Sequence, residues 1–501
     1  MIDVRASPGD RQATGYANRQ CAETLRPAEA GTIRHALHGV PAAVLLLAGC
    51  VYLAGPAGAA AARQETIAFV GGTLINGTGA DPLADAAVVV TGDRIRQVGP
   101  AAQLALPAGA RTIDVSGKWV IPGLIDAHVH FFQSASLYTR PDIIDLRRVR
   151  PYDRELAWLR ERIPSTLARY IASGVTAVAD LAGPVWTFEV RELAGRLPVS
   201  PRVAVAGPGL APTLPAAMTS ADPPGVIVRT PAEARERVQR LQDYHPDLLK
   251  IWFLYSPDMD LDREMQWVRA AVGRAHAQGL RAAAHATHLE LARKMVEAGV
   301  DILVHSVDDQ PVDRAFIELL RNRGTLYIPT LMVGEGYQEV LGRNVVLSDI
   351  ERRTGDPAVI AGFADLHRLF PRLPRRPVTP PDPVVLDNLK RLAEAGVTVA
   401  AGSDAGNIGT LHGPALHREL ELMHAAGLAP NAVLVAATAA GARVLGRADE
   451  LGTIEPGKLA DLLILDADPL QDIRNTRRIH RVVKGGEVHD PETLLNRLAT
   501  R

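Results

Sequence analysis

Six residues with metal-binding side chains follow or interrupt short apolar runs, each with the length and composition of a buried β-strand. His128 and His130 are two residues apart, so in an extended strand both side chains point to the same face. The other members occur singly in later runs, and all are expected near one another if those strands share a sheet edge. The six residues are His128, His130, Lys250, His285, His305 and Asp404.

Together these side chains suit a site for two divalent metal ions. Four imidazoles with one or two oxygen donors fit Zn2+, the metal we expect, although ligand type alone also fits other first-row metals. Two such ions ~3.5 to 4 Å apart lower the pKa of a bridging water and make hydroxide available near neutral pH. Asp404 would take the proton of the hydroxide and pass it to the leaving nitrogen. The predicted chemistry is hydrolysis of a carbon–nitrogen bond in a small-molecule amide.

Lys250 is the unusual member of the set, because it lies within the apolar run LLKIWF, where an unpaired ammonium is costly. Addition of CO2 to its amine would form a carbamate and turn a cation into an anionic bridge between two metals. The structural alternative is a lysine that pairs with a buried carboxylate or extends to the surface. The histidines have a structural alternative as well, as residues of the core or the surface.

The elements that must position these residues form an alternating pattern of strands and helices. Eight strand-like runs alternate with helical patterns, which predicts a closed parallel barrel of the TIM-type (β/α)8 class. Helices are expected at 264–278, 289–298 and 386–395, and proline-rich loops at 207–225 and 371–383. The strand candidates are 120–130, 174–180, 202–209, 247–253, 280–285, 302–306, 326–331 and 397–404.

Two β-rich segments bracket this barrel. Residues 67–118 and 451–490 alternate short apolar runs with turn signals such as Asn-Gly and Ser-Gly. We expect both segments to form one small β-sandwich domain. The predicted domain organisation is a targeting segment at 1–62, sandwich strands at 63–119, the hydrolase barrel at 120–447, and further sandwich strands at 448–501.

At these positions the chain resembles the amidohydrolase superfamily. The resemblance runs from about residue 67 to residue 490, through the motifs DAHVH, SGVTAVAD, AAAHATH, VDILVHS, GSDAGN and LGTIEPGKLADLLILDADPL. Within the superfamily the chain is most similar to the branch of imidazolonepropionases and prolidase-like peptidases. The resemblance implies a metal-dependent hydrolase of an amide, with an N-acyl amino acid or an Xaa-Pro-like dipeptide as substrate.

The resemblance also implies a role for each member of the set. His128 and His130 would bind the first metal, His285 and His305 the second, carboxylated Lys250 would bridge them, and Asp404 would be ligand and proton shuttle. Asp126 and Asp180 would support strand ends.

Two departures from the family pattern concern the substrate pocket. The lysine is followed by IWFLYSP instead of a Ser-Gly-Gly type turn, and His285 by Ala-Thr-His instead of Ala-His-Gly. Candidate substrate contacts are Tyr255 after the fourth strand, His412 after the eighth, and His288, which could instead support a ligand; the alternative for all three is an ordinary loop residue.

Other functions remain open from the sequence. One alternative is a mononuclear hydrolase or deaminase of a cyclic amide or aromatic compound, in which Lys250 stays an amine. Another is a catalytically silent binding protein that keeps the barrel, although retention of every ligand position argues against it. The oligomeric state is not predicted.

Composition excludes several classes of protein. Of the 501 residues, 47% are hydrophobic and 22% are charged, which is typical of a globular chain and excludes a wholly disordered or collagen-like one. The 55 basic and 56 acidic residues nearly cancel, so no nucleic-acid partner is expected. The chain has 2 cysteines, Cys21 and Cys50, which excludes a disulfide scaffold or a cysteine metal cluster in the rest of the chain.

The N-terminal segment has the pattern of an export signal. No charged residue occurs from 39 to 62, and the apolar centre at 44–47 is too short for a membrane span. Leu-Ala-Gly-Cys at 47–50 resembles a bacterial lipobox and predicts a lipid anchor at Cys50, and cleavage between 57 and 62 is the alternative. We expect a periplasmic enzyme or an outer-surface lipoprotein, or a cytoplasmic enzyme if this segment is not a signal.

Overall fold

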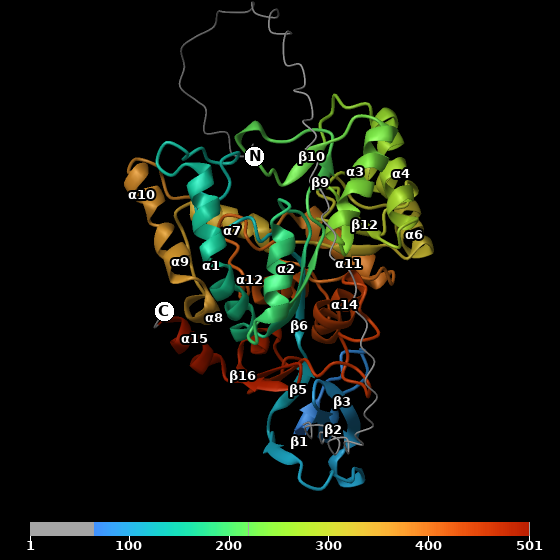
Figure 1. Ribbon diagram of the computed structural model, residues 1–501, viewed down its shortest axis with the longest axis vertical. Coiled ribbons are helices and arrows are strands. Elements are labelled where there is room, and N and C mark those ends of the chain that lie inside the picture. The colour runs from blue at the N-terminus through green and yellow to red at the C-terminus, as the bar shows by residue number, and fades with distance from the viewer. Residues whose placement is uncertain (1–64, 219, 500–501) are drawn as a thin grey trace, which may run out of the picture. The chain divides into compact units, whose positions relative to one another are not determined.

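The computed structural model describes residues 65–218 and 220–499 (Figure 1). The predicted signal segment, with the proposed lipid anchor at Cys50, lies outside the described residues. Among the helices that are described, none is both long and apolar enough to cross a membrane.

Strands from both ends of the chain form one eight-stranded sheet, in the order β17-β16-β15-β5-β1-β2-β3 with β4 paired to β1. Strand β15 joins the two ends, because it pairs antiparallel with both β5 and β16. Apolar side chains of this sheet pack together into one core, which includes the buried residues Phe69, Val88 and Ile464. The strands are β1 (Thr66–Leu74), β2 (Leu83–Thr91), β3 (Arg94–Pro100), β4 (Arg111–Asp114), β5 (Trp119–Pro122), β15 (Leu462–Leu465), β16 (Ile479–Lys484) and β17 (Glu487–His489). The described strands pair edge to edge into a single sheet, so the predicted sandwich of two packed sheets is not confirmed.

The middle of the chain contains two parallel sheets. The first has the order β6-β7-β8 and the second β10-β9-β11-β12-β13-β14. Their strands are β6 (Leu124–Val129), β7 (Val175–Asp180), β8 (Arg202–Val205), β9 (Gly209–Ala211), β10 (Gly225–Ile227), β11 (Leu248–Ile251), β12 (Arg281–His285), β13 (Ile302–Val304) and β14 (Leu326–Ile328).

A few backbone hydrogen bonds outside the regular strand ladders connect the two parallel sheets. On one side the amide of Asp247 donates to the carbonyl of Val205 over 2.9 Å. On the other side, residues 398–404 lie between β14 and β6, where Tyr327 donates to Thr398 over 3.0 Å and Ala127 donates to Ala401 over 2.9 Å. This segment forms bridges but not a regular strand, so the described strands do not make up a continuous eight-stranded barrel.

Helices cover the parallel sheets (Figure 1). The three expected helices occur with slightly different ends, at α4, α5 and α11. Side-chain caps define two of the helix starts: Asp260 accepts a hydrogen bond from the amide of Arg263 at the start of α4, and Asp382 accepts one from the amide of Val384 at the start of α11. The α-helices are α1 (Tyr152–Ala172), α2 (Thr187–Arg196), α3 (Pro231–Leu241), α4 (Leu261–His276), α5 (Leu289–Glu297), α6 (Arg314–Arg323), α7 (Met332–Leu341), α8 (Asp349–Thr354), α9 (Pro357–Gly362), α10 (Asp365–Leu369), α11 (Pro383–Glu394), α12 (Ala415–Ala425), α13 (Pro430–Val435), α14 (Gly441–Val444) and α15 (Pro491–Ala499).

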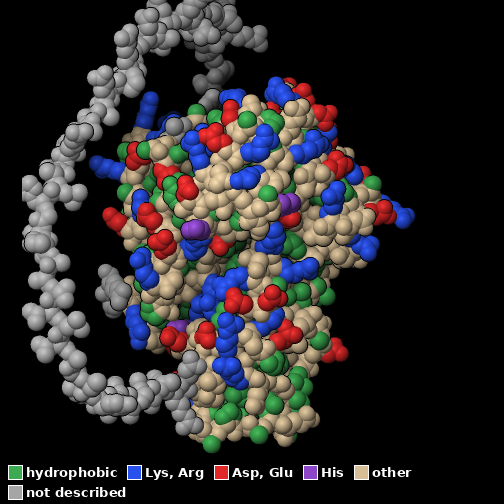
Figure 2. Space-filling view, turned by 45° about the vertical axis from the view of Figure 1, so that its right-hand side comes forward, with side chains coloured by type: hydrophobic (Ala, Val, Ile, Leu, Met, Phe, Trp, Pro, Cys, Tyr) green, Lys and Arg blue, Asp and Glu red, His purple; other side chains and the backbone are tan. Residues whose placement is uncertain are grey.

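The surface carries charges of both signs. On the face drawn in Figure 2, acidic and basic side chains are interspersed over the described residues. This distribution fits the near-zero net charge of the sequence.

Candidate metal centre

The six predicted ligand residues lie together at the carboxyl ends of the parallel strands. His128 is in β6 and His130 follows it, Lys250 is in β11, and His285 ends β12. His305 follows β13, and Asp404 ends the segment that lies beside β6. A cavity of about 100 Å3 is lined by His130, Lys250, His285, His305 and Asp404. His128 lies directly behind it, in contact with His130 and Asp404.

The tightest cluster consists of His128, His130 and Asp404. The Nε2 atoms of the two histidines are 3.1 Å apart, and Asp404 Oδ1 lies 3.1 Å from Nε2 of His130 and 3.5 Å from Nε2 of His128. The Nδ1 of His130 lies 2.9 Å from the carbonyl oxygen of Ala182, which can only accept, so Nδ1 carries the proton. The Nε2 of His130 faces a carboxylate oxygen of Asp404. Three ligand atoms within 4.8 Å of one another are an arrangement that a cation stabilises.

The second pair of histidines adjoins this cluster. The ring centroids of His285 and His305 are 4.3 Å apart, and those of His128 and His305 are 5.1 Å apart. The Nδ1 of His305 is 2.7 Å from the hydroxyl of Thr330, which fixes the orientation of the ring. His305 and Asp404 both have left-handed backbone conformations, with φ of 75° and 59°. Such conformations are costly for non-glycine residues and concentrate at functional sites.

Lys250 is buried without a partner. Its side chain is 2% exposed, and its Nζ has no hydrogen-bond partner among the described residues. Burial lowers the pKa of Lys250 to about 7, although the nearby Asp404 carboxylate acts in the opposite direction. Lys250 therefore neither forms a buried ion pair with a described residue nor extends to the surface, which were the two structural alternatives.

Burial also sets the charge of the neighbouring groups. It lowers the pKa of His128 and His285 well below the usual value and that of His305 to about 3, so these imidazoles are neutral, as metal ligands must be. Burial raises the pKa of Asp404, but a proton held by the adjacent His128 or His130 lowers it more, and the net pKa lies well below its usual range. The site therefore combines neutral nitrogen donors with an ionised carboxylate.

Asp126 supports the end of the segment that carries Asp404. Its carboxylate accepts hydrogen bonds from the hydroxyl of Ser403 over 2.5 Å and from the amide of Ser403 over 2.9 Å. The amide of His128 donates to the same carboxylate over 3.3 Å. Asp126 thus joins β6 to the residue before Asp404, as the sequence predicted for a supporting residue. Asp180 lies 3.9 Å from Nδ1 of His130.

A hydrogen-bonded network of polar residues that the sequence did not predict lies next to Asp404. Arg140 donates to Asn407 Oδ1 over 2.5 Å and to the hydroxyl of Tyr337 over 2.8 Å, and Tyr337 donates to the same Asn407 oxygen over 2.7 Å. The Nδ2 of Asn407 donates to the backbone carbonyl of Asp404 over 3.1 Å. Asp142 holds the other side of the guanidinium with two hydrogen bonds, of 2.8 and 2.7 Å. This network, which we call the Asn407 clamp, fixes the loop that carries Asp404.

The three candidate substrate contacts do not line the cavity of the metal centre. The rings of Tyr255 and His288 are 4.3 Å apart, and His288 follows Thr287, which lines a larger neighbouring cavity.

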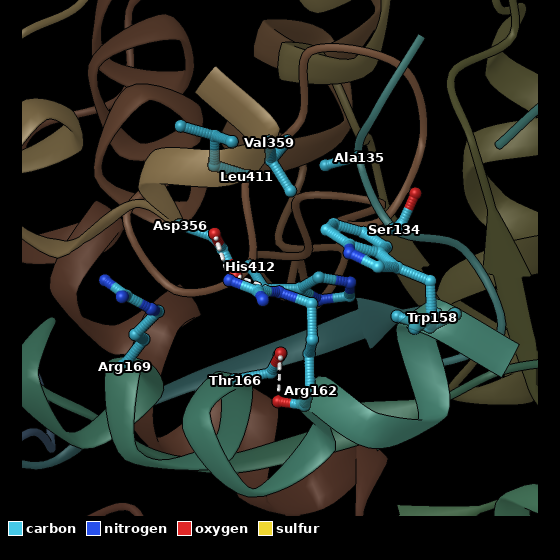
Figure 3. A pocket seen from close by; sticks show the side chains of 11 residues that line it. Ser134, Ala135, Trp158, Arg162, Thr166, Arg169, Asp356, Val359, Leu411 and His412 are labelled. Carbon is cyan, nitrogen blue, oxygen red and sulfur yellow. Dashed lines mark hydrogen bonds and ion pairs between the residues drawn. The ribbon is translucent and has the colours of Figure 1, made fainter. Parts of the chain in front are cut away.

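His412 lies in another place. Its Nε2 donates to the carbonyl of Gln133 over 2.8 Å, and its Nδ1 accepts from the hydroxyl of Tyr170 over 2.9 Å. Figure 3 shows His412 at a separate cavity of about 20 Å3, beside the ion pair of Arg162 and Asp356. A cavity of that size holds about one water molecule. Both ring nitrogens of His412 are thus engaged inside the protein.

Comparison with known proteins finds a protein family whose model matches most of the chain. The model of the amidohydrolase family matches residues 119–489. The chain is 27% identical over 423 residues to the 5-methylthioadenosine/S-adenosylhomocysteine deaminase of Symbiobacterium thermophilum, a match that covers 81% of this chain and 86% of that protein. It is 36% identical over 104 residues to the imidazolonepropionase of Geobacillus kaustophilus, which covers 20% of this chain and 24% of that protein.

Solved structures show the same fold. A Xaa-Pro dipeptidase with bound methionine superimposes with a TM-score of 0.65 at 24% identity, over 85% of this chain and 100% of that one. Phenylurea hydrolase B superimposes with a TM-score of 0.64 at 24% identity, over 86% of this chain and 98% of that one. With the family match, these neighbours imply that the two parallel sheets belong to a TIM-type barrel.

Proposed function

The chain belongs to the amidohydrolase family and is a metal-dependent hydrolase of carbon–nitrogen bonds, and we propose that it cleaves a small-molecule amide at a centre of two metal ions. The observation that carries this proposal is the convergence of six ligand-type side chains from five chain segments: five of them line one cavity, and His128 contacts two of these five. Their arrangement also supports our prediction of an eight-stranded barrel, in which residues 398–404 would take the place of the eighth strand between β14 and β6.

The residues present fit a pair of divalent ions. His128, His130 and Asp404 offer converging lone pairs, and Asp404 Oδ1 and Lys250 Nζ are buried without hydrogen-bond partners. His128 and His130 would hold the first ion and His285 and His305 the second, carboxylated Lys250 would be shared by both, and Asp404 would be a further ligand and the proton shuttle. When bound, two ions, for which Zn2+ is our choice, would supply hydroxide near neutral pH and polarise the substrate carbonyl.

Lys250 is suited to carboxylation because much of its amine is neutral near pH 7. The neutral nitrogen attacks CO2, a C–N bond forms, and one proton leaves to solvent, which gives a carbamate with one negative charge. The carbamate is an anion and would balance the positive charge of the metal ions, whereas a buried ammonium without a partner is energetically costly.

Asp404 is suited to move the proton of the reaction. Its carboxylate is ionised and borders the cavity, while the Asn407 clamp and Asp126 hold its backbone on both sides. It would accept a proton from the attacking water and deliver it to the leaving nitrogen.

The substrate we propose is an N-acyl amino acid or an Xaa-Pro-like dipeptide. The superimposed Xaa-Pro dipeptidase supports this class. A second candidate is a mononuclear deaminase or hydrolase of a cyclic amide or aromatic compound, which the matched deaminase supports. Metal stoichiometry separates the two candidates.

We further propose that the enzyme is exported, on the pattern of residues 39–62. The domain boundaries at residues 62, 119 and 447 likewise remain a proposal, supported by the sheet that both ends of the chain share.

The experiment that tests the function replaces Asp404 by Asn and screens amides with the parent and the variant. We expect turnover of at least one amide to be abolished in Asp404→Asn while the circular dichroism spectrum stays unchanged. Asp243→Asn, at an exposed position, is the matched control and should keep full activity. Undiminished turnover by Asp404→Asn would refute the proposed role of this carboxylate.

A further inference from the structure

We propose that a large cavity beside the metal centre binds the acyl group of the substrate, and that this group is bulky, apolar and uncharged at its far end. The inference rests on the proposed function, because it assigns the reacting carbonyl to the metal centre. It goes further by naming the substrate class that the surrounding walls favour. We call this cavity the acyl chamber.

The acyl chamber opens directly onto the candidate ligands. It has a volume of about 560 Å3, against about 100 Å3 for the cavity of the metal centre. The two cavities share Arg140, His285, His305, Asp404 and Asn407. The smaller cavity has room for the ions and the reacting group, so the rest of a substrate must extend into the chamber. Its volume lies within the range of ~300 to 1,000 Å3 that is typical of ligand pockets.

Apolar side chains form much of the chamber wall. They come from the loop after β6, from the start of α7, from the loop that leads into α11 and from the first turn of α11. Ile143 is 42% exposed there, one of few large apolar side chains with such exposure in the described chain. An apolar ligand would remove this surface from water. The apolar wall residues include Ile143, Leu331, Val333, Pro381 and Val385.

The charges of the chamber disfavour an anionic group at its outer end. Arg140 contributes a cation, but Asp142 already neutralises it through two hydrogen bonds. Asp308 and Asp382 also line the chamber, as does Glu335, which is paired with Arg418. A carboxylate in the chamber would face these acids, while the one arginine among the described wall residues is already paired with Asp142.

Alkyl hydroxamic acids test the chamber without turnover. The hydroxamate group binds the metals, and the dependence of affinity on alkyl chain length measures the contact of the chain with the chamber wall. Isothermal titration calorimetry with the metal-loaded protein would compare acetohydroxamic with octanohydroxamic acid. Full burial of a methylene is worth about fourfold in affinity, and half burial about twofold. If each of the six added methylenes is half buried, octanohydroxamic acid should bind about 60-fold more tightly than acetohydroxamic acid. Suberic monohydroxamic acid, which has a carboxylate at the far end, should bind at least about tenfold more weakly than octanohydroxamic acid.

Gly334 offers a way to fill the chamber. It lies in the first turn of α7 and lines the chamber, and a Cβ at this position meets no atom within 4 Å. Gly334→Leu should therefore fold normally, lower the affinity for octanohydroxamic acid about tenfold or more, and leave that for acetohydroxamic acid within about twofold. Gly273→Leu is the matched control, since Gly273 lies in α4, lines neither cavity and also has open space around its Cα.

The outcomes separate this inference from the proposed function. Equal affinity for short and long hydroxamates, or an equal effect of Gly334→Leu on both, would overturn the acyl chamber while the metal centre stands. Failure of acetohydroxamic acid and of its longer relatives to bind at all would overturn the metal centre and, with it, the chamber.

Discussion

Replacement of Lys250 by Met should stabilise the metal-free protein, although it should remove activity. Burial lowers the pKa of Lys250 from its usual value of 10.5 to about 7. This difference of about 3.5 pH units corresponds to about 5 kcal/mol of unfolding free energy. Met has a similar length and no charge, so the variant escapes this cost.

The sign of the pH dependence follows from linkage. The unfolded chain binds the lysine proton up to about pH 10.5, and the folded protein binds it only up to about pH 7. The cost is therefore fully present below pH 7, falls between pH 7 and pH 10.5, and vanishes above that window. At pH 9.5 about 1 kcal/mol remains.

Denaturant unfolding of metal-free, CO2-free protein at pH 6.5 and pH 9.5 measures this effect. Lys250→Met should unfold at higher denaturant than the parent at pH 6.5, by about 3 to 5 kcal/mol, and the difference should shrink at pH 9.5. Lys390→Met, at an exposed lysine, is the control and should change stability by less than about 0.5 kcal/mol. A parent that is equally or more stable at pH 6.5 would refute the account of Lys250 as a buried lysine without a partner.

Three further predictions concern the metal centre. Asn407→Ala removes the acceptor of Arg140 and Tyr337 and should lower kcat by about 100-fold at unchanged metal content, and a kcat within twofold of the parent would contradict the Asn407 clamp. Thr330→Val removes the partner of His305 and should weaken metal binding by about 10- to 100-fold in a chelator competition assay, whereas Thr330→Ser should retain it. Removal of metal with a chelator should abolish turnover, and Zn2+ with bicarbonate should restore it more completely than Zn2+ alone; equal recovery would argue against carboxylation.

Much of the site could be predicted because it follows from strand geometry. The spacing of His128 and His130 fixes a common face, and the carboxyl ends of parallel strands meet at one edge. Lys250 was conspicuous because a lysine in a buried strand contradicts its surroundings. Such features depend on local sequence, so they are visible without a structure.

The rest depends on contacts between distant segments. Arg140 lies in a loop without periodic pattern, and its contact with Asn407 spans 267 residues. Asn407 itself carried a weak signal, three residues after Asp404 within GSDAGN. His412 had the residue type of a substrate contact, but Tyr170 and Gln133 engage its ring, and no local pattern predicts that pairing.

The strand prediction for 397–404 illustrates the same limit. The run VTVAAGSD reads as a strand, but Asp404 adopts a φ of 59°, which ends the extended conformation. The apolar pattern predicted where the segment lies, between β14 and β6, and not its conformation at the functional end.

The number of divalent metal ions per chain tests the central claim most directly. The protein would be expressed with bicarbonate, purified without chelators and analysed by inductively coupled plasma mass spectrometry. We expect a value near two, with loss of about one ion in Lys250→Met. A value near one in the parent would contradict the binuclear centre and favour the mononuclear deaminase or hydrolase in its place.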